Sequence, residues 1–176
     1  KAKPGELNYA SGPTGGGSHL SAELLKHMAG VNIVRIAYKT GSAALTDVLA
    51  GRVQMTFDDV PTLMPNVKAG KLRALAVTSA DPSALAPGLP TVASSGLPGY
   101  ESGSLFGIFA PAGTPAAIIN RLNQEIVRLL NRAEVQERFL NAGAETVGSS
   151  PEQFGATIKS EIVRMGKVIK DAGIKI

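Results

Sequence analysis

The chain has 176 residues, and 44% of them are apolar, so it can bury a core and disorder is not expected. Its formal charge of +4 comes from 18 basic and 14 acidic residues scattered singly, without the basic stripe and adjacent aromatic residues typical of nucleic-acid binding. Cysteine is absent, which excludes disulfides, thiolate metal sites and cysteine nucleophiles and leaves the cellular compartment open.

The beginning of the chain carries no recognisable leader. The residues KAKPGELNYA lack the apolar stretch of a signal peptide, and no apolar run in the chain is long enough to cross a bilayer. We therefore expect a soluble mature domain whose leader, if the protein is exported, has been removed upstream of Lys1.

The first half of the chain alternates short apolar strands with helices, a pattern typical of a mainly parallel α/β sheet. The expected helices each end at a glycine, as helices with a left-handed terminal residue do. The expected strands span residues 7–11, 32–37, 53–57 and 72–78, and the helices between them end at Gly30, Gly51 and Gly70. The fourth strand is almost continuously apolar, as expected of a central strand buried on both faces.

The second half follows a segment rich in proline and glycine, residues 81–100, which we interpret as an extended loop or hinge. A strand is expected at 105–110, and then come a helix capped by Thr114 and Pro115, a shorter helix at 133–141, and a last helix opened by a capping box at 150–153. Three amphipathic helices have too little sheet here to cover. We infer a missing upstream segment or a partner chain.

The most informative segment is SGPTGGGSHL, residues 11–20, a Gly-rich turn between a strand and a helix. The first N–H groups of a helix have no intrahelical partners and carry partial positive charge, so an anion is favoured there. Three adjacent glycines let a ligand approach the main chain, and Thr14 and Ser18 add hydroxyl donors suited to a carboxylate. The alternative is a flexible turn that only connects two elements.

Two further turns are expected at the same edge of the sheet, because parallel strands end together. Residues 38–42 follow the second strand, and Ser42 is either a helix cap or a ligand contact. Asp58 and Asp59 follow the third strand, where one is expected to cap the next helix and the other to face a ligand.

Other site chemistries fit the residues less well. The glycine spacing matches neither nucleotide motif, and His19 and His27 stand eight residues apart without the pattern of a zinc hydrolase, so we expect no cofactor and no metal. Ser11 or Ser18 with His19 and Asp58 superficially supplies a catalytic triad, but the G-x-S-x-G elbow is missing. We therefore expect no catalytic residues.

Taken together, five segments resemble the tripartite tricarboxylate transporter receptors, also called Bug proteins. They occur in the same order over essentially the whole chain: LNYASGPTGGGSHLSAELL, RIAYKTGSAALTDVLAGRVQMTFDD, GKLRALAVTS, LPTVASSGLPGY and FGIFAPAGTP.

The resemblance implies a type II periplasmic-binding-protein-like α/β fold with two lobes that close on a carboxylate and deliver it to membrane transporter subunits. It implies that residues 1–101 form the complete second lobe, with a mainly parallel sheet. Residues 102–176 would be the mostly helical C-terminal portion of the first lobe, which lacks its N-terminal strands because the chain lacks the family's N-terminal third. The uncovered faces would then favour a homodimer or strand exchange.

The combined prediction is a periplasmic solute-binding protein, not an enzyme, that captures a small carboxylate. The alternatives are an effector-binding domain of a transcription regulator and a Ser hydrolase. The predicted ligand-binding residues are Ser11, Thr14, Gly15, Gly16, Gly17, Ser18, His19, Tyr38, Thr40, Gly41, Ser42 and Asp58.

Overall fold

The computed structural model describes residues 4–174 of the chain, which form two compact units. Residues up to Ser104, together with those from Met165 onward, make up unit 1, and Leu105–Arg164 make up unit 2. The assignment of the chain to two receptor lobes, 1–101 and 102–176, stays a prediction. The outermost residues of those ranges, 1–3 and 175–176, lie outside the described part.

Unit 1 is built on a three-stranded parallel sheet, which confirms the predicted α/β class. The strands are β1 (Asn8–Ser11), β2 (Val34–Ala37) and β3 (Met55–Thr56), in the order β2-β1-β3. Tyr9 of the central strand lies opposite Arg35 on one side and Met55 on the other. With this order the chain runs outward from β1 to β2 and then crosses back to β3, so β1 and β3 flank a switch in connection direction.

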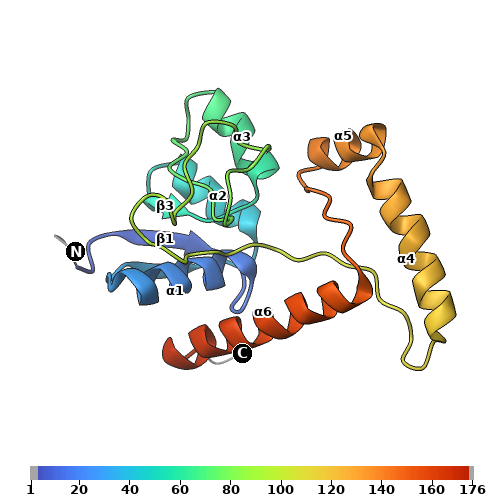
Figure 1. The fold of residues 1–176 in the computed structure, drawn as a ribbon. Coiled ribbons are helices and arrows are strands. Elements are labelled where there is room, and N and C mark those ends of the chain that lie inside the picture. The colour runs from blue at the N-terminus through green and yellow to red at the C-terminus, as the bar shows by residue number, and fades with distance from the viewer. Residues whose placement is uncertain (1–3, 175–176) are drawn as a thin grey trace. The chain divides into compact units, whose positions relative to one another are not determined.

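Helices cover both faces of this sheet. Helix α1 (Gly17–Ala29) lies on one side of β1 and α2 (Gly41–Leu49) on the other, as Figure 1 shows. Successive strand residues point to opposite faces. Accordingly, buried Tyr9 packs with residues of the α1 side, including Ala22, and buried Ala10 packs with residues of the α2 side, including Ala44. Helix α3 (Val60–Lys68) follows β3.

The helix ends of unit 1 follow the predicted glycine signals. Gly30 caps α1 with a φ of 59°, the left-handed conformation that glycine adopts without a Cβ penalty, and its N–H donates to the carbonyl of Lys26. Gly51 and Gly70 also have positive φ just beyond α2 and α3. The predicted stops are therefore confirmed.

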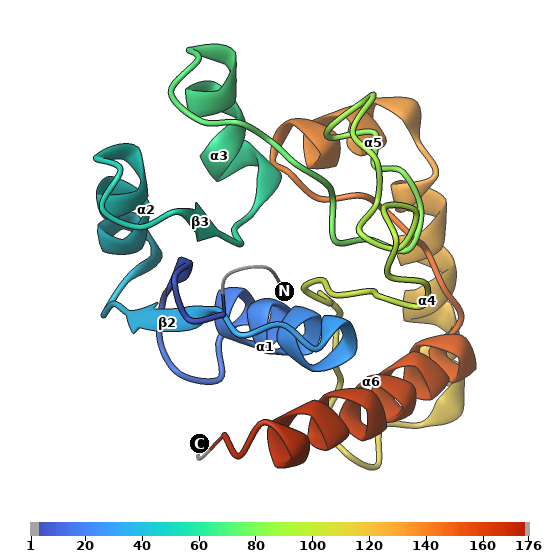
Figure 2. The same ribbon diagram turned by 90° about the vertical axis from the view of Figure 1, so that its left-hand side faces the viewer.

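A third core in unit 1 joins residues far apart in the sequence. Leu24 of α1, Tyr100 and Val168 are buried together. Val168 belongs to α6 (Pro151–Asp171), whose C-terminal part runs beside α1 in both views (Figures 1 and 2). The Tyr100 hydroxyl donates to the carbonyl of Ser21 over 2.9 Å, so this aromatic residue is anchored by packing and by a buried hydrogen bond.

Unit 2 contains α4 (Ala116–Leu130), α5 (Ala133–Asn141) and the first part of α6. The predicted capping box of α6 is confirmed: the Ser150 N–H donates to Gln153 Oε1, and the Gln153 N–H donates to Ser150 Oγ. None of the residues 105–164 is buried, although the helices are amphipathic. Its helices are thus ordered by local signals and carry no core of their own.

Two predicted strands are wrong. Residues 72–78 form one isolated bridge, Val77 to Thr91, and Leu75 is 67% exposed, so the segment is not a central strand buried on both faces. Residues 105–110 are extended without a ladder, and most of their apolar side chains are exposed. An apolar run becomes a strand only when a neighbouring strand exchanges a ladder of backbone hydrogen bonds with it. Among the described residues, neither segment has such a partner strand.

One predicted helix start is displaced by a residue. Pro115 rather than Thr114 is the N-cap of α4, and the Thr114 hydroxyl instead donates to the carbonyl of Pro111 over 2.8 Å. The local turn at residues 111–114 therefore uses the hydroxyl that was expected to cap the helix.

Candidate functional site

Three turns meet at the carboxyl edge of the sheet in unit 1, as predicted. A Cβ placed on Gly12, after β1, would lie 3.6 Å from the backbone nitrogen of Gly41, after β2. A Cβ on Gly41 would lie 3.6 Å from Asp58 Oδ2, after β3. A Cβ would make only ordinary van der Waals contact at either position, so these distances show that the three turns lie side by side. The edge that they form is the place where open parallel sheets bind ligands.

The first turn of α1 and the loop just before it present unpaired main-chain donors. The N-cap residue is Gly16, so no side-chain hydrogen bond caps this end of the helix. Among the described residues, the N–H groups of Thr14, Gly17 and Ser18 have no hydrogen-bond acceptor. Because helix N-termini carry partial positive charge, these three donors can receive the oxygens of an anion.

The turn is held in shape by bonds within itself. The Gly12 N–H donates to Ser18 Oγ over 3.1 Å, and the Gly15 N–H donates to His19 Nδ1 over 3.1 Å. Gly15 has a φ of 80°, a left-handed conformation suited to glycine. Ser18 and His19, both predicted as ligand contacts, therefore accept main-chain hydrogens of the turn through these atoms.

Arg35 of β2 reaches the same turn with all its side-chain nitrogens. Nε donates to Ser11 Oγ over 2.7 Å, Nη1 donates to Thr14 Oγ1 over 3.0 Å, and Nη2 donates to the carbonyl of Gly12 over 3.0 Å. Ser11 is fully buried and also donates to the Gly12 carbonyl. The buried Ser11 hydroxyl therefore bonds groups of the protein itself, Arg35 and the Gly12 carbonyl.

His19 is buried at the start of α1. Burial, followed by the nearby positive charge of Arg35, lowers the pKa of its imidazole below the ordinary value. The Gly15 N–H points at Nδ1, so the neutral ring is the form that fits the turn. Protonation at Nδ1 would remove an acceptor from the turn.

The second turn uses its polar groups locally. Thr40 is the N-cap of α2, its Oγ1 accepts from the Ala43 N–H over 3.3 Å, and it lies 3.1 Å from Ser42 Oγ. The cap is thus Thr40, not Ser42. The Tyr38 hydroxyl donates to Asp47 over 2.7 Å, and this bond raises the pKa of the Tyr38 phenol.

Asp58 and Asp59 divide their roles differently from the expectation. Asp59 stands at the N-cap position of α3, but its side chain makes no capping bond. Asp58 Oδ1 accepts from the Asp59 N–H over 2.9 Å, and both residues are exposed. The Asp58 carboxylate therefore stabilises its own turn and lies beside Gly41.

A buried polar cluster fastens α1 to β1 beneath the turn. Glu23 Oε1 accepts from the Tyr9 hydroxyl over 2.6 Å and from Lys26 Nζ over 2.7 Å. Burial works to raise the pKa of the Glu23 carboxyl, but the bonds from Lys26 and Tyr9 outweigh it and hold that pKa below its usual value. Burial and the bond to Glu23 strongly raise the pKa of Tyr9. The cluster sets the position of the helix that carries the free donors.

Sequence reasoning missed Arg35 as a site residue. The available signal was a single charged residue inside the apolar run 32–37. Identifying its target required the register that places β2 beside β1, because that pairing brings the guanidinium to the end of the neighbouring strand. The other predicted residues of the first two turns do lie together, whereas the Tyr38 hydroxyl is directed to α2.

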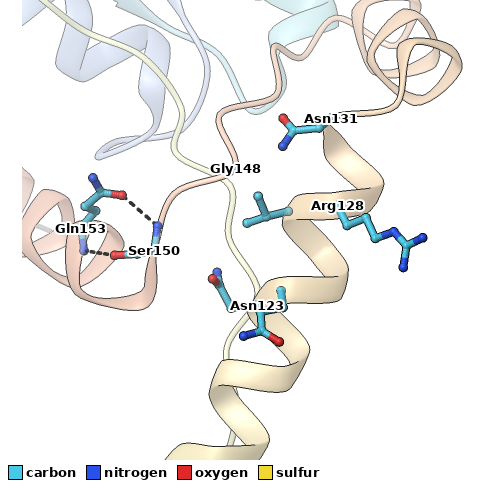
Figure 3. A pocket seen from close by; sticks show the side chains of 8 residues that line it. Asn123, Arg128, Asn131, Gly148, Ser150 and Gln153 are labelled. Atoms are coloured by element: carbon cyan, nitrogen blue, oxygen red, sulfur yellow. Dashed lines mark hydrogen bonds between the residues drawn. The ribbon is translucent and has the colours of Figure 1, made fainter.

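Unit 2 has an open depression of about 520 Å³ between α4 and the start of α6 (Figure 3). Asn123, Arg128 and Asn131 come from α4, and the guanidinium of Arg128 points away from Ser150 and Gln153. Ser150 and Gln153 bond each other in the capping box, and Asn123 donates to the Ser149 carbonyl. Three polar residues of this depression, Asn123, Ser150 and Gln153, bond neighbouring groups of unit 2. The turns of unit 1 are therefore the better candidate for a ligand site.

Across residues 4–174, no group of His, Cys, Asp or Glu is arranged to hold a metal ion. Within the same range, none of the helices has the length and apolar character of a membrane span.

The whole architecture matches known proteins. Residues 1–174 match the family described as tripartite tricarboxylate transporter family receptor. Protein BugT of Bordetella pertussis is 36% identical over the full chain, which covers 54% of that protein. The chain spans about half the length of this relative and of the UPF0065 protein in the tcbD-tcbE intergenic region of Pseudomonas sp. strain P51, which is 39% identical over 170 residues.

Two solved structures similar to this chain are described with a carboxylate ligand. One, from R. palustris with adipate, has 40% identity and a TM-score of 0.81, and the match covers 98% of this chain and 58% of the other. The second is MatC from Rhodopseudomonas palustris with bound malate, at 29% identity and a TM-score of 0.70, covering 94% of this chain and 57% of the other.

These findings confirm the predicted family and the periplasmic-binding-protein-like fold, and they support an extracytoplasmic location. They do not support the regulator domain or the Ser hydrolase, because the family consists of substrate-binding receptors, which are not enzymes. The chain belongs to the tripartite tricarboxylate transporter receptor family.

Proposed function

We propose that this chain supplies the carboxylate-capturing turn of an extracytoplasmic solute receptor that passes small carboxylates to membrane transporter subunits. The observation that carries this proposal is the set of unpaired N–H groups of Gly17 and Ser18 at the start of α1 and of Thr14 in the loop before it. A carboxylate only accepts hydrogen bonds, so it complements a surface made of donors. Binding is non-covalent, with no chemical step.

The other predicted residues support this turn. Gly12 and Gly41 lie where the neighbouring turns come together, and Gly15 supplies the left-handed bend. Gly16 precedes the helix as its N-cap, and Thr40, Ser42 and Asp58 lie on the neighbouring turns. Relatives described with adipate and with malate support dicarboxylic acids of four to six carbons as a ligand class, and adipate is the natural probe.

The test is an NMR titration of the isotope-labelled chain with adipate. We expect the amide signals of Thr14, Gly17 and Ser18 to shift with increasing adipate, because their hydrogens acquire a charged acceptor. The neutral 1,6-hexanediol, with the same carbon length, should leave them in place. If adipate moves amides elsewhere but leaves these three unchanged, the site is wrong.

A matched pair of variants isolates one donor. Gly17 is the first residue of α1, where proline is well accommodated, and Gly16 has the extended ψ of 164° that a residue before proline favours. Gly17→Pro removes one N–H and should weaken adipate binding about 10- to 100-fold, the effect of one bond to a charged group. Gly17→Ala keeps the N–H and should bind nearly as the parent does, since its Cβ would meet Ser104 Oγ at an ordinary 3.9 Å.

We also propose that unit 2 is the C-terminal portion of the first lobe and that its uncovered faces drive self-association of the isolated chain, as a homodimer or by strand exchange. The support is the absence of any buried residue within 105–164 and the exposure of large apolar side chains there. Those at the start of the unit are Leu105, Phe106, Ile108 and Phe109. Apolar surface of this extent usually marks an interface.

Light scattering after size-exclusion chromatography tests this association. The mass should rise above the 18.1 kDa of one chain as concentration increases, and Phe106→Ser should lower the association. Leu75→Ser is the control, because Leu75 is an exposed apolar residue of unit 1. A mass that stays monomeric at every concentration would contradict self-association while leaving the carboxylate site untouched.

A further inference from the structure

We propose that Arg35 is the positioning residue of the Gly-rich turn: its guanidinium holds residues 11–14 in the shape that leaves the three N–H groups free for a carboxylate. This inference rests on the proposed function for its ligand, but the role of Arg35 in shaping the turn is measurable without one.

The first argument is geometric. One guanidinium donates to three groups in succession along the turn: Ser11 Oγ, the Gly12 carbonyl and Thr14 Oγ1, at 2.7 to 3.0 Å. A planar fork with fixed donor directions can satisfy such a set at once, whereas an ammonium is a single point of charge. The contacts span the turn from the end of β1 to the last residue before the glycines.

The second argument concerns entropy. Gly15, Gly16 and Gly17 are conformationally permissive, and a loose turn would have to be ordered when the ligand binds. Ordering the turn in advance leaves more of the interaction energy for affinity. The bonds from Gly12 to Ser18 and from Gly15 to His19 lie on the helix side of the turn, and Arg35 supplies the matching restraint on the strand side.

The third argument concerns hydrogen-bond polarity. Thr14 Oγ1 accepts from Arg35, which leaves its own hydrogen without an acceptor among the described residues. The guanidinium therefore favours a Thr14 hydroxyl that donates outward. It also places a positive charge beside the turn, where a carboxylate benefits from it. Arg35 acts through the turn in this arrangement and need not touch the ligand.

The test compares Arg35→Met, Arg35→Lys and the parent chain. Arg73→Met is the control for lost positive charge, because Arg73 is exposed in unit 1 and has no hydrogen bond or ion pair within the described residues. Circular dichroism and thermal melting establish that each variant remains folded. The informative readouts are amide exchange of Gly12 and Gly15, the NMR pKa of His19, and adipate affinity.

In Arg35→Met, we expect the exchange of the Gly12 and Gly15 amides to accelerate about tenfold or more, and adipate affinity to fall about 10- to 100-fold, as expected for lost bonds to a charged group. The pKa of His19 should rise, because one of the influences that lowers it is gone. Arg35→Lys should retain the His19 value but recover only part of the amide protection. Arg73→Met should match the parent in all readouts.

Unchanged amide exchange and an unchanged His19 pKa in a folded Arg35→Met protein would overturn the positioning role. So would full recovery by lysine of every readout, since charge alone would then explain the effect. If adipate fails to bind even the parent chain, the proposed function fails, but the exchange and pKa measurements still decide whether Arg35 shapes the turn.

Discussion

The two units of the molecule show different ways of ordering a chain. Unit 1 has three buried clusters, which pack β1, its two flanking helices and the end of α6. Unit 2 has well-formed helices, of which α6 opens with a capping box, yet the structure describes no buried residue within residues 105–164. Local signals suffice to form a helix, whereas a core needs residues brought together from distant parts of the sequence.

The sharpest test of this contrast replaces one aromatic residue in each unit. Tyr100 is 1% exposed and packs in the third cluster of unit 1, whereas Phe106 of unit 2 is 83% exposed. Tyr100→Ala should lower the free energy of unfolding by about 3–5 kcal/mol, because it leaves a cavity and removes the buried hydrogen bond to the Ser21 carbonyl. Phe106→Ala should change it by about 0.5 kcal/mol or less, as measured by urea denaturation. Equal effects would erase the distinction.

A second, smaller difference is expected along α6, which passes from one unit to the other. Val168 is buried at 3%, and Val163, five residues earlier, is 74% exposed. Val168→Ala should destabilise unit 1 by about 2 kcal/mol, whereas Val163→Ala should have almost no effect on its urea midpoint. If Val163→Ala proves as damaging as Val168→Ala, the first part of α6 has a covered face.

The smallest effect concerns the local signals of unit 2. Ser150→Ala removes one half of the capping box and should reduce the stability of the first turns of α6 by about 1 kcal/mol. Amide exchange of residues 152–155 reports this fraying directly. Ser160→Ala, at an exposed position within α6, is the control and should leave those amides unchanged. Loss of the whole helix in Ser150→Ala would mean that α6 depends on its cap far more than on its packing.

Much of the fold was predictable because its signals are local. Gly30, Gly51 and Gly70 end the three helices of unit 1, and Ser150 and Gln153 open α6 as a capping box. The strands at 72–78 and 105–110 were not correctly predicted, because apolar composition does not reveal whether a pairing strand is present. Similarly, Tyr38 follows β2 as expected, but its hydroxyl is directed to Asp47.

The amino-acid sequence by itself determined that a Gly-rich turn opens a helix after the first strand and that the first N–H groups of this helix have no intrahelical acceptors, since these properties depend on neighbouring residues. Only the tertiary structure decided which donors stay free and which side chain bonds the turn. Strand pairing brings Arg35 to Ser11, Gly12 and Thr14, and the bends of the neighbouring turns bring Gly41 and Asp58 beside them. Such contacts join residues far apart in the chain, so their geometry follows from packing.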